Sequence, residues 1–240
     1  VDYIDVKDSD ANTNTVTCRT SVDSGNNNAN WLFENQGMVV YSSGTLSYPW
    51  FRTLGDNATT WSSNTKATDL DAGATIQHII VKECPTRVER IMATINNVGD
   101  IWVSTWAVPG NWAAAGLKIE DSVSDSNNDY RCFDIGYESE RGNALVVFQD
   151  NTADLKYRTW NGSSWELEKN VYISTTTGIP TWVRTVSNPN KNSNEIALSW
   201  IDANGQIGAK LWDGTSWWAE VLLSTSARVN SKSTLNKKPR

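Results

Sequence analysis

The chain is poor in the residue types on which most catalytic and metal sites depend. Among its 240 residues there are one histidine, two methionines and three cysteines. His78 lies in an apolar stretch, where it is expected to pack within a strand rather than act as a base. The cysteine spacing matches no zinc motif, and neither G-x-S-x-G nor H-E-x-x-H occurs. We therefore expect a protein that is not an enzyme and needs no cofactor.

Long apolar runs and excess positive charge are also missing. No apolar run approaches the ~20 residues of a membrane helix, which predicts that the chain is not inserted into a membrane. The net charge of −6 argues against nucleic acid and against anionic lipid as partners. Tryptophan is abundant, at 13 residues, and the chain is dense in Asn, Ser and Thr. This composition is typical of secreted β proteins and predicts an extracellular or cell-surface location.

What the sequence does contain is a repeat with a period of a little over fifty residues. In each copy, an apolar run leads through a turn to a second run that ends at an equivalent position. These positions lie 52, 54 and 52 residues apart and are held by Leu54, Trp106, Trp160 and Trp212. A second tryptophan follows each of them after a short turn: Trp61, Trp112, Trp165 and Trp217. A period in this range indicates one supersecondary unit copied several times.

Each copy is predicted to consist of short strands. Runs such as 144–148 are rich in β-branched and aromatic residues, end at Asn, Asp or Gly turns, and show no 3.6-residue apolar period. We predict an all-β fold of four repeated four-stranded antiparallel meanders of about 52 residues, arranged like the blades of a β-propeller. The expected units are 31–72, 73–122, 127–173 and 178–225, and whether they close into a ring is left open. A polar extension at 1–30 is expected to supply an added strand, and 226–240 forms a tail.

Two hairpins carry a resemblance to known proteins. The stretches W-N-G-S-S-W at 160–165 and W-D-G-T-S-W at 212–217 resemble the W-[DN]-G-x-x-W hairpin of lectin-like β-propellers and of tandem repeats in secreted cell-surface proteins of bacteria and archaea. The resemblance covers roughly residues 37–223. In fucose-binding propellers of this kind, an Arg in the first strand and a Glu three residues before the Trp hold the sugar. Here those positions hold Val146 and Ala197, and Tyr157 and Ala209, so the resemblance does not extend to fucose binding of that type.

A cation precedes the repeated tryptophan position by two residues in three of the four copies. Residues two apart share one face of a strand, so a cation and an indole are expected to lie side by side and to bind an anionic glycan. The candidate ligand-binding residues are Arg52, Trp106, Arg158, Trp160, Lys210 and Trp212. The alternative is that each cation stacks on its tryptophan and caps the edge of a blade.

Two short patterns suggest modification or metal binding in loops. Asp8, Asp10 and Asn12 begin like a calcium loop, but Gly at the sixth place and Glu at the twelfth are missing, which leaves a solvated loop as the alternative. Asn57 and Asn161 each begin an Asn-x-Ser/Thr glycosylation sequon.

The cysteines allow one disulfide at most, with three possible pairings. Cys84 and Cys132 both lie beside the first strands of consecutive units, which favours that pair. The alternative is that all three, Cys18 included, are buried or free thiols.

Together these features predict a non-enzymatic extracellular protein that acts as a binding or adhesion module or as a structural surface component. Its partner is then a surface glycan, as for a lectin, or further copies of itself. A filament or surface-layer subunit joined by strand exchange is an alternative, because an unpaired blade edge is a template for strand addition. A fragment of a glycoside hydrolase is a less favoured one, based on the paired acids Glu138/Glu140 and Glu166/Glu168.

Overall fold

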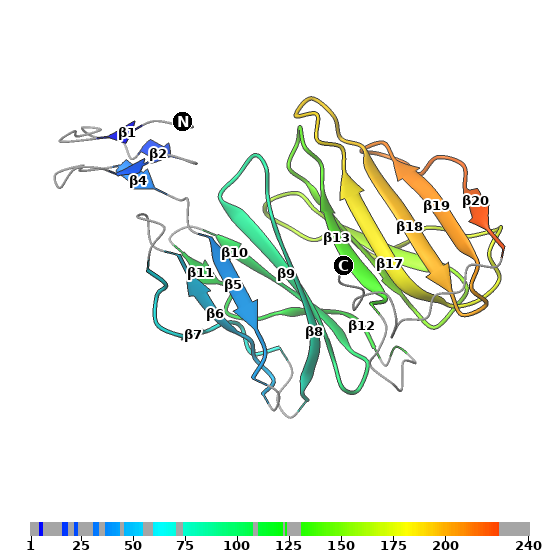
Figure 1. Ribbon diagram of the computed structural model, residues 1–240, viewed down its shortest axis with the longest axis horizontal. Helices are drawn as coiled ribbons and strands as arrows, with labels where there is room; N and C mark the ends of the chain where they lie inside the picture. The colour runs from blue at the N-terminus through cyan, green and yellow to red at the C-terminus, as the bar shows by residue number, and fades with distance from the viewer. Residues whose placement is uncertain are drawn as a thin grey trace, which may run out of the picture. The chain divides into compact units, whose positions relative to one another are not determined.

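The computed structural model is built of β-strands, and no helix occurs within the residues that it describes (Figure 1). Those residues are 37–43, 46–54, 60–70, 74–107, 110–121, 123 and 131–225, together with the backbone of four short strands nearer the N-terminus. The prediction of an all-β fold is confirmed. Over this part of the chain, no helix is long and apolar enough to cross a membrane. The calcium candidates Asp8, Asp10 and Asn12 and the sequon at Asn57 lie outside the described residues.

The four N-terminal strands form two parallel pairs. β1 (Asp5–Val6) pairs with β3 (Val22–Asp23), and β2 (Val16–Cys18) pairs with β4 (Trp31–Phe33). The boundary expected at residue 30 therefore falls in the sequence between β2 and β4, which pair with each other.

The chain divides into two compact units, one made of 1–43 and 48–67 and the other of 44–47 and 68–240. The first unit contains sheet 1, an antiparallel meander of β5 (Met38–Tyr41), β6 (Trp50–Thr53) and β7 (Thr65–Lys66). Within the described residues, sheet 1 has three strands instead of the expected four.

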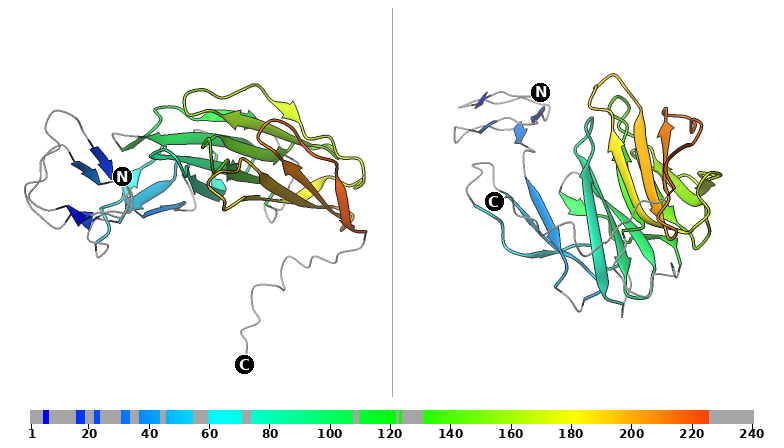
Figure 2. Two further views of the ribbon diagram at one scale, coloured as in Figure 1. Left: turned by 90° about the horizontal axis from the view of Figure 1, so that it is seen from above. Right: turned by 45° about the vertical axis from the view of Figure 1, so that its right-hand side comes forward.

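The second unit contains three larger antiparallel meanders (Figures 1 and 2). Sheet 2 consists of β8 (Ile76–Glu83), β9 (Glu89–Asn96), β10 (Ile101–Ala107), β11 (Asn111–Trp112) and β12 (Leu117–Glu120). Sheet 3 consists of β13 (Phe133–Tyr137), β14 (Ala144–Gln149), β15 (Leu155–Trp160) and β16 (Lys169–Asn170). Sheet 4 consists of β17 (Pro180–Ser187), β18 (Ile196–Asp202), β19 (Ile207–Trp212) and β20 (Val221–Ser224). The first strand of sheet 3, β13, contacts the first strands of both sheets beside it, β8 and β17.

The strand register makes the repeated tryptophans structurally equivalent. Each one lies at or next to the end of the third strand of its sheet and pairs with the first part of the second strand: Trp106 with Arg90, Trp160 with Ala144, and Trp212 with Ile196. The hairpin turns after Trp160 and Trp212 are closed by bridges to Trp165 and Trp217. Gly162 and Gly214 both have φ of 97°, a left-handed conformation that explains the glycine of the motif.

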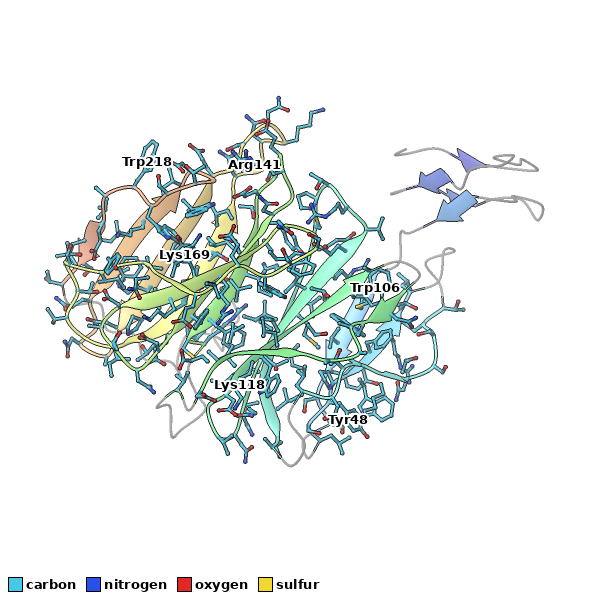
Figure 3. All side chains as sticks on the ribbon, turned by 180° about the vertical axis from the view of Figure 1, so that it is seen from behind. Tyr48, Trp106, Lys118, Arg141, Lys169 and Trp218 are labelled. Atoms are coloured by element: carbon cyan, nitrogen blue, oxygen red, sulfur yellow. The ribbon has the colours of Figure 1, made fainter. Side chains whose placement is uncertain are left out.

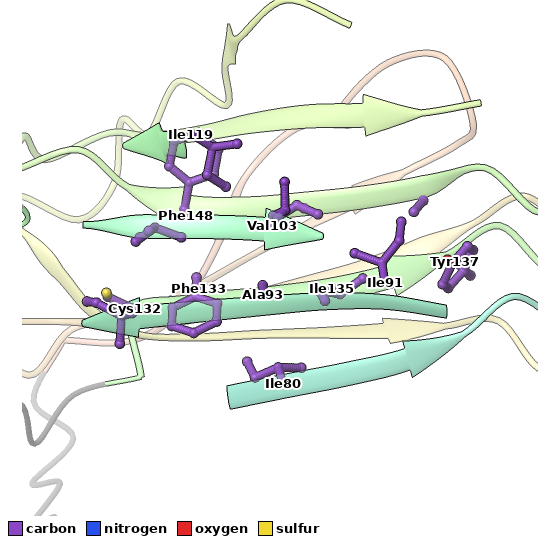
Figure 4. Close-up of a cluster of buried hydrophobic side chains, with 14 of the residues drawn as sticks. Ile80, Ile91, Ala93, Val103, Ile119, Cys132, Phe133, Ile135, Tyr137 and Phe148 are labelled. Carbon is purple, nitrogen blue, oxygen red and sulfur yellow. The ribbon is translucent and has the colours of Figure 1, made fainter. Parts of the chain in front are cut away.

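Sheets 2 and 3 pack face to face over the larger core (Figure 4). Sheet 2 contributes Ile80, Ile91, Ala93, Ile95, Ile101 and Val103, and sheet 3 contributes Phe133, Ile135, Ala144, Val146 and Phe148. All six residues of β14 are buried, because successive side chains point alternately to the sheets on either side. This explains why the run 144–148 is apolar without alternation.

Sheets 3 and 4 enclose a second core. Leu145, Val147, Leu155 and Tyr157 of sheet 3 meet Val183, Ile196, Leu198, Trp200 and Trp212 of sheet 4. Trp200 is buried, and its indole donates to Thr176 Oγ1 at 2.9 Å. It lies flat against Gly208, where an added Cβ would come within 2.2 Å of its ring. The sequence Ile-Gly-Ala at 207–209 is thus required by a tryptophan on the adjacent strand.

The expected disulfide between Cys84 and Cys132 is not formed, and both residues are buried thiols. Cys84 Sγ donates to the carbonyl of Gly142 at 3.4 Å, beside the hairpin that follows β13. Cys132 precedes the start of β13, at the opposite end from Tyr137 (Figure 4). At a rise of about 3.3 Å per residue, the two ends of this strand are roughly 16 Å apart. A disulfide needs Cα atoms within about 7 Å, so lying beside first strands was not enough to pair these residues.

Candidate functional site at the junctions between sheets

Each of the two junctions in the second unit is crossed by a hydrogen bond from tryptophan to glutamate. Trp160 Nε1 of sheet 3 donates to Glu89 Oε2 of sheet 2 at 2.8 Å. Trp212 Nε1 of sheet 4 donates to Glu138 Oε1 of sheet 3 at 3.0 Å. In both cases the carboxylate comes from the hairpin between the first two strands of the preceding sheet.

The same hairpin supplies an arginine that lies against the glycine of the Trp-Asx-Gly turn. Arg141 Nη1 donates to the carbonyl of Gly214 at 2.9 Å. The guanidinium of Arg87 fills the space beside Gly162, where an added Cβ would come within 2.8 Å of its Cζ. We call this arrangement, a glutamate and an arginine of one sheet around the tryptophan and glycine of the next, the junction clasp.

The carboxylates of the junction clasps are committed to protein donors. Burial raises the pKa of Glu138, and the hydrogen bond from the Trp212 indole acts in the opposite direction. Glu89 also accepts from the hydroxyl of Tyr137 at 3.1 Å and pairs with Arg87 at 3.1 Å. Burial and the nearby Glu89 raise the pKa of Tyr137 well above its ordinary value. Glu89 and Glu138 thus each link one sheet to the tryptophan of the next.

The second tryptophan of each motif packs against the first. Ring centroids are 5.3 Å apart for Trp160 and Trp165 and 5.4 Å apart for Trp212 and Trp217. Tyr157 of sheet 3 meets both rings of the latter pair edge-on. Since offset and edge-on contacts are the favoured geometries of aromatic pairs, the motif adds packing energy at the junction.

The three tryptophans expected to bind ligand do not present free ring faces. Trp106 and Trp212 are buried, and Trp160 is half-buried with its indole in the junction clasp. The ring of Trp106 is covered by the guanidinium of Arg90, 4.7 Å from the ring centroid. The strand pattern gives the shared face, and in sheets 3 and 4 that face lies toward the preceding sheet.

The three expected cations bind protein groups. Lys210 donates to the carbonyls of Val171 and Tyr172 at 2.9 and 2.6 Å, and burial lowers its pKa. Arg158 donates to the carbonyl of Glu166 at 3.5 Å. In sheet 1, Arg52 donates from Nε to the side-chain oxygen of Asn64. Lys210 therefore ties sheet 4 to the backbone that follows β16, the last strand of sheet 3.

Two exposed side chains flank the turn that follows Trp212: Arg141 comes from sheet 3, and Trp218 lies on the side of sheet 4 that points away from sheet 3, where it lines a cavity with Ala197 and Ala209. The side chain of Arg141 is 47% exposed, and Trp218 is 56% exposed (Figure 3). Both contact one turn, because Trp218 Nε1 donates to Asp213 Oδ2 at 3.2 Å while Arg141 donates to Gly214. Hydrogen bonds from Ser216 and Thr215 hold the pKa of Asp213 well below its usual range, so its carboxylate stays ionised.

Sequence reasoning did not single out Arg87, Arg141 or Trp218. The available signal was weak: an Arg close to a Glu in the hairpin before the second strand of sheets 2 and 3, and a doubled tryptophan at 217–218. At the other junction, Glu166 takes the place of Trp218 after the second tryptophan, so the exposed indole belongs to one junction of the two.

Within the described ranges, no group of three or more His, Cys, Asp or Glu side chains is placed to hold a metal ion. Asn161 is exposed, and its side chain organises the turn by accepting from the backbone of Ser163 and Ser164 at 2.9 Å each. Glycosylation at Asn161 stays a prediction.

The chain matches no family model and no curated protein, but it resembles solved structures. One is the Aleuria aurantia lectin, described as a six-bladed β-propeller with a novel fucose recognition mode, at a TM-score of 0.51 and 13% identity. The alignment covers 80% of this chain and 58% of that lectin. Another is the BP39L lectin from Burkholderia pseudomallei, at a TM-score of 0.53, 15% identity, and 78% and 56% coverage of the two chains. At this level of identity the likeness shows the fold, and the fold is a β-propeller. The chain spans under three fifths of the length of either lectin.

Proposed function

We propose that this chain is a non-enzymatic carbohydrate-binding β-propeller module that acts at the cell surface or outside the cell. One observation carries the proposal: an exposed indole, Trp218, and a half-exposed guanidinium, Arg141, flank the same rigid turn. The shared fold with two lectins and the secreted-type composition support it.

The chemistry of this pair suits a sugar with an acidic group. An exposed indole offers an apolar face on which the C–H side of a sugar ring can stack, and its polar edge is held by Asp213. A guanidinium donates a fork of hydrogen bonds that matches a carboxylate or adjacent hydroxyls. The residues at the fucose-binding positions are apolar or aromatic, so the proposed ligand is an acidic glycan rather than fucose.

The paired acids that suggested a hydrolase support a non-enzymatic role instead. Glu138 is buried in the junction clasp, and Glu140 Oε2 accepts from Asn194 at 2.5 Å. Glu166 pairs with Lys169 at 2.6 Å, and Glu168 lies 3.8 Å from Lys156. A glycosidase needs an acid and a second carboxylate facing one scissile bond, and these groups face protein cations or amides.

The test is a glycan array of neutral, sialylated and uronic-acid oligosaccharides, followed by titration of the best binder with tryptophan fluorescence as the readout. We expect binding of an acidic member and a loss of about tenfold or more in affinity for Trp218→Ala, corresponding to about 1.4 kcal/mol. Tyr172→Ala is the matched control, because Tyr172 is an exposed aromatic residue away from this turn. An array without binders, unchanged affinity in Trp218→Ala, or turnover of any glycan would overturn the proposal.

A further inference from the structure

Sheet 4 has an apolar face that points away from sheet 3. Val186 is 63% exposed and Leu223 is 59% exposed, and Val221 lies beside them on β20. The same face includes side chains of β18 and β19 that alternate with those buried against sheet 3: Ala197, Ser199, Ala209 and Leu211. We refer to these seven residues as the sheet 4 face.

The strand register shows that the sheet 4 face is the surface through which the other sheets pack. In each sheet, one residue of the second strand pairs with the repeated tryptophan. The residue after it is Ile91 in sheet 2, Leu145 in sheet 3 and Ala197 in sheet 4. Ile91 and Leu145 are fully buried under the next sheet, whereas Ala197 is exposed. The face is therefore the third copy of a sheet-packing surface that is used twice within the chain.

The sheet 4 face is hollowed where its counterparts are filled. Ala197, Ser199 and Ala209 occupy the positions that hold Leu145, Val147 and Tyr157 in sheet 3. The smaller side chains leave a cavity of about 380 Å³ open to solvent. The residues that line such a cavity lack packing contacts on one side unless large apolar side chains enter it.

The hairpin beside this face repeats the acidic half of the junction clasp. The backbone carbonyl of Glu195 accepts from the backbone N–H of Asn188 at 2.9 Å, as the backbone carbonyl of Glu89 accepts from the N–H of Cys84 in sheet 2. Where the Glu89 carboxylate binds the indole of the next sheet, the Glu195 carboxylate is bonded within its own hairpin, to Asn188 Nδ2 at 2.7 Å. Lys191, an exposed cation, lies in the same hairpin.

We propose that the sheet 4 face binds a second copy of this chain, which packs on it as sheet 4 packs on sheet 3. The contact continues an interface already present twice in the molecule, with the same register and with Glu195 at the place that Glu89 has in sheet 2. A head-to-tail contact of this type closes into a ring or extends into a filament.

The test is the oligomeric state of the full chain, measured by sedimentation velocity over a wide range of concentrations. We expect reversible self-association of the wild type. Leu223→Glu and Val186→Glu each place a charge in the apolar contact and should weaken association by about a hundredfold or more. Leu167→Glu is the matched control, because Leu167 is 81% exposed in sheet 3 outside this face, and it should associate like the wild type.

Three results would overturn the proposal: a monomer at every concentration, unchanged association in both glutamate variants, or equal weakening by Leu167→Glu. A monomer that associates only after deletion of 226–240 would show that the chain's own tail occupies the face, which also overturns it. Near-UV circular dichroism checks folding, and either variant alone suffices if the other fails to fold. Trp218 lines the same cavity as this face, so the glycan titration is repeated with both variants. Glycan binding that is retained by a variant that no longer associates shows that the two proposals stand separately.

Discussion

The indole of Trp212 donates to Glu138 Oε1 at 3.0 Å across the junction of sheets 3 and 4, and the two residues are 74 positions apart in the chain. Trp160 and Glu89 repeat the same relationship between sheets 2 and 3 at 2.8 Å. A buried indole N–H without an acceptor is costly, so the carboxylate of the preceding sheet stabilises Trp160 and Trp212 where they are. The junction clasp therefore couples the most regular feature of the sequence to the packing of one sheet on the next.

This coupling predicts the effect of removing the acceptor. Glu138→Leu should lower the free energy of unfolding by about 1–3 kcal/mol, because the Trp212 N–H is left buried without a partner. Glu138→Gln should lower it far less, since the amide oxygen can still accept. Urea denaturation followed by tryptophan fluorescence measures both values. Equal destabilisation by Leu and Gln would show that the bond to Trp212 contributes nothing.

The raised pKa of Glu138 predicts how this comparison changes with pH. In the folded chain burial disfavours the ionised form, so the wild type loses stability as pH rises from the unfolded pKa of about 4.3 through the higher folded pKa. Glu138→Gln carries no such penalty. Its stability relative to the wild type should therefore rise as pH increases above about 4 and level off once pH exceeds the folded pKa of Glu138. Urea midpoints at several pH values test this, and a difference that is flat or of opposite slope would contradict the raised pKa.

The sequence predicts the strands, the hairpin turns and the repeat because these depend on neighbours along the chain. The left-handed glycines at 162 and 214 and the alternation of β18 follow from local pattern alone. Depth of burial does not: the pattern predicts that Lys210 and Trp212 share a face, but it does not give the carbonyls of Val171 and Tyr172 that Lys210 binds. The clasp residues Arg87 and Arg141 were missed because each acts on a turn more than fifty residues away, and nothing local identifies that turn.

Gly208 offers a test of how tightly sheet 4 packs on itself. Gly208→Ala should destabilise the chain by about 1–3 kcal/mol or more, because its Cβ would lie 2.2 Å from the ring of Trp200, which the core and Thr176 hold in place. Gly37→Ala is the control, since its nearest neighbour would be at 3.4 Å. If steric contact is the cause, Trp200→Leu should make Gly208→Ala nearly neutral in the double variant. Additive losses would point to a different cause.

The placement of Cys84 and Cys132 at opposite ends of β13 predicts their reactivity. In a Cys18→Ser background, neither thiol should react with a thiol reagent while the chain is folded, because both are buried. Both should react after denaturation without a reductant, giving two labels per chain by intact mass. Reduction before denaturation should not change that number or the denaturation midpoint. A chain that takes up no label until it is reduced would instead show that the two cysteines are joined, and that the packing of sheet 2 on sheet 3 differs from the arrangement described here.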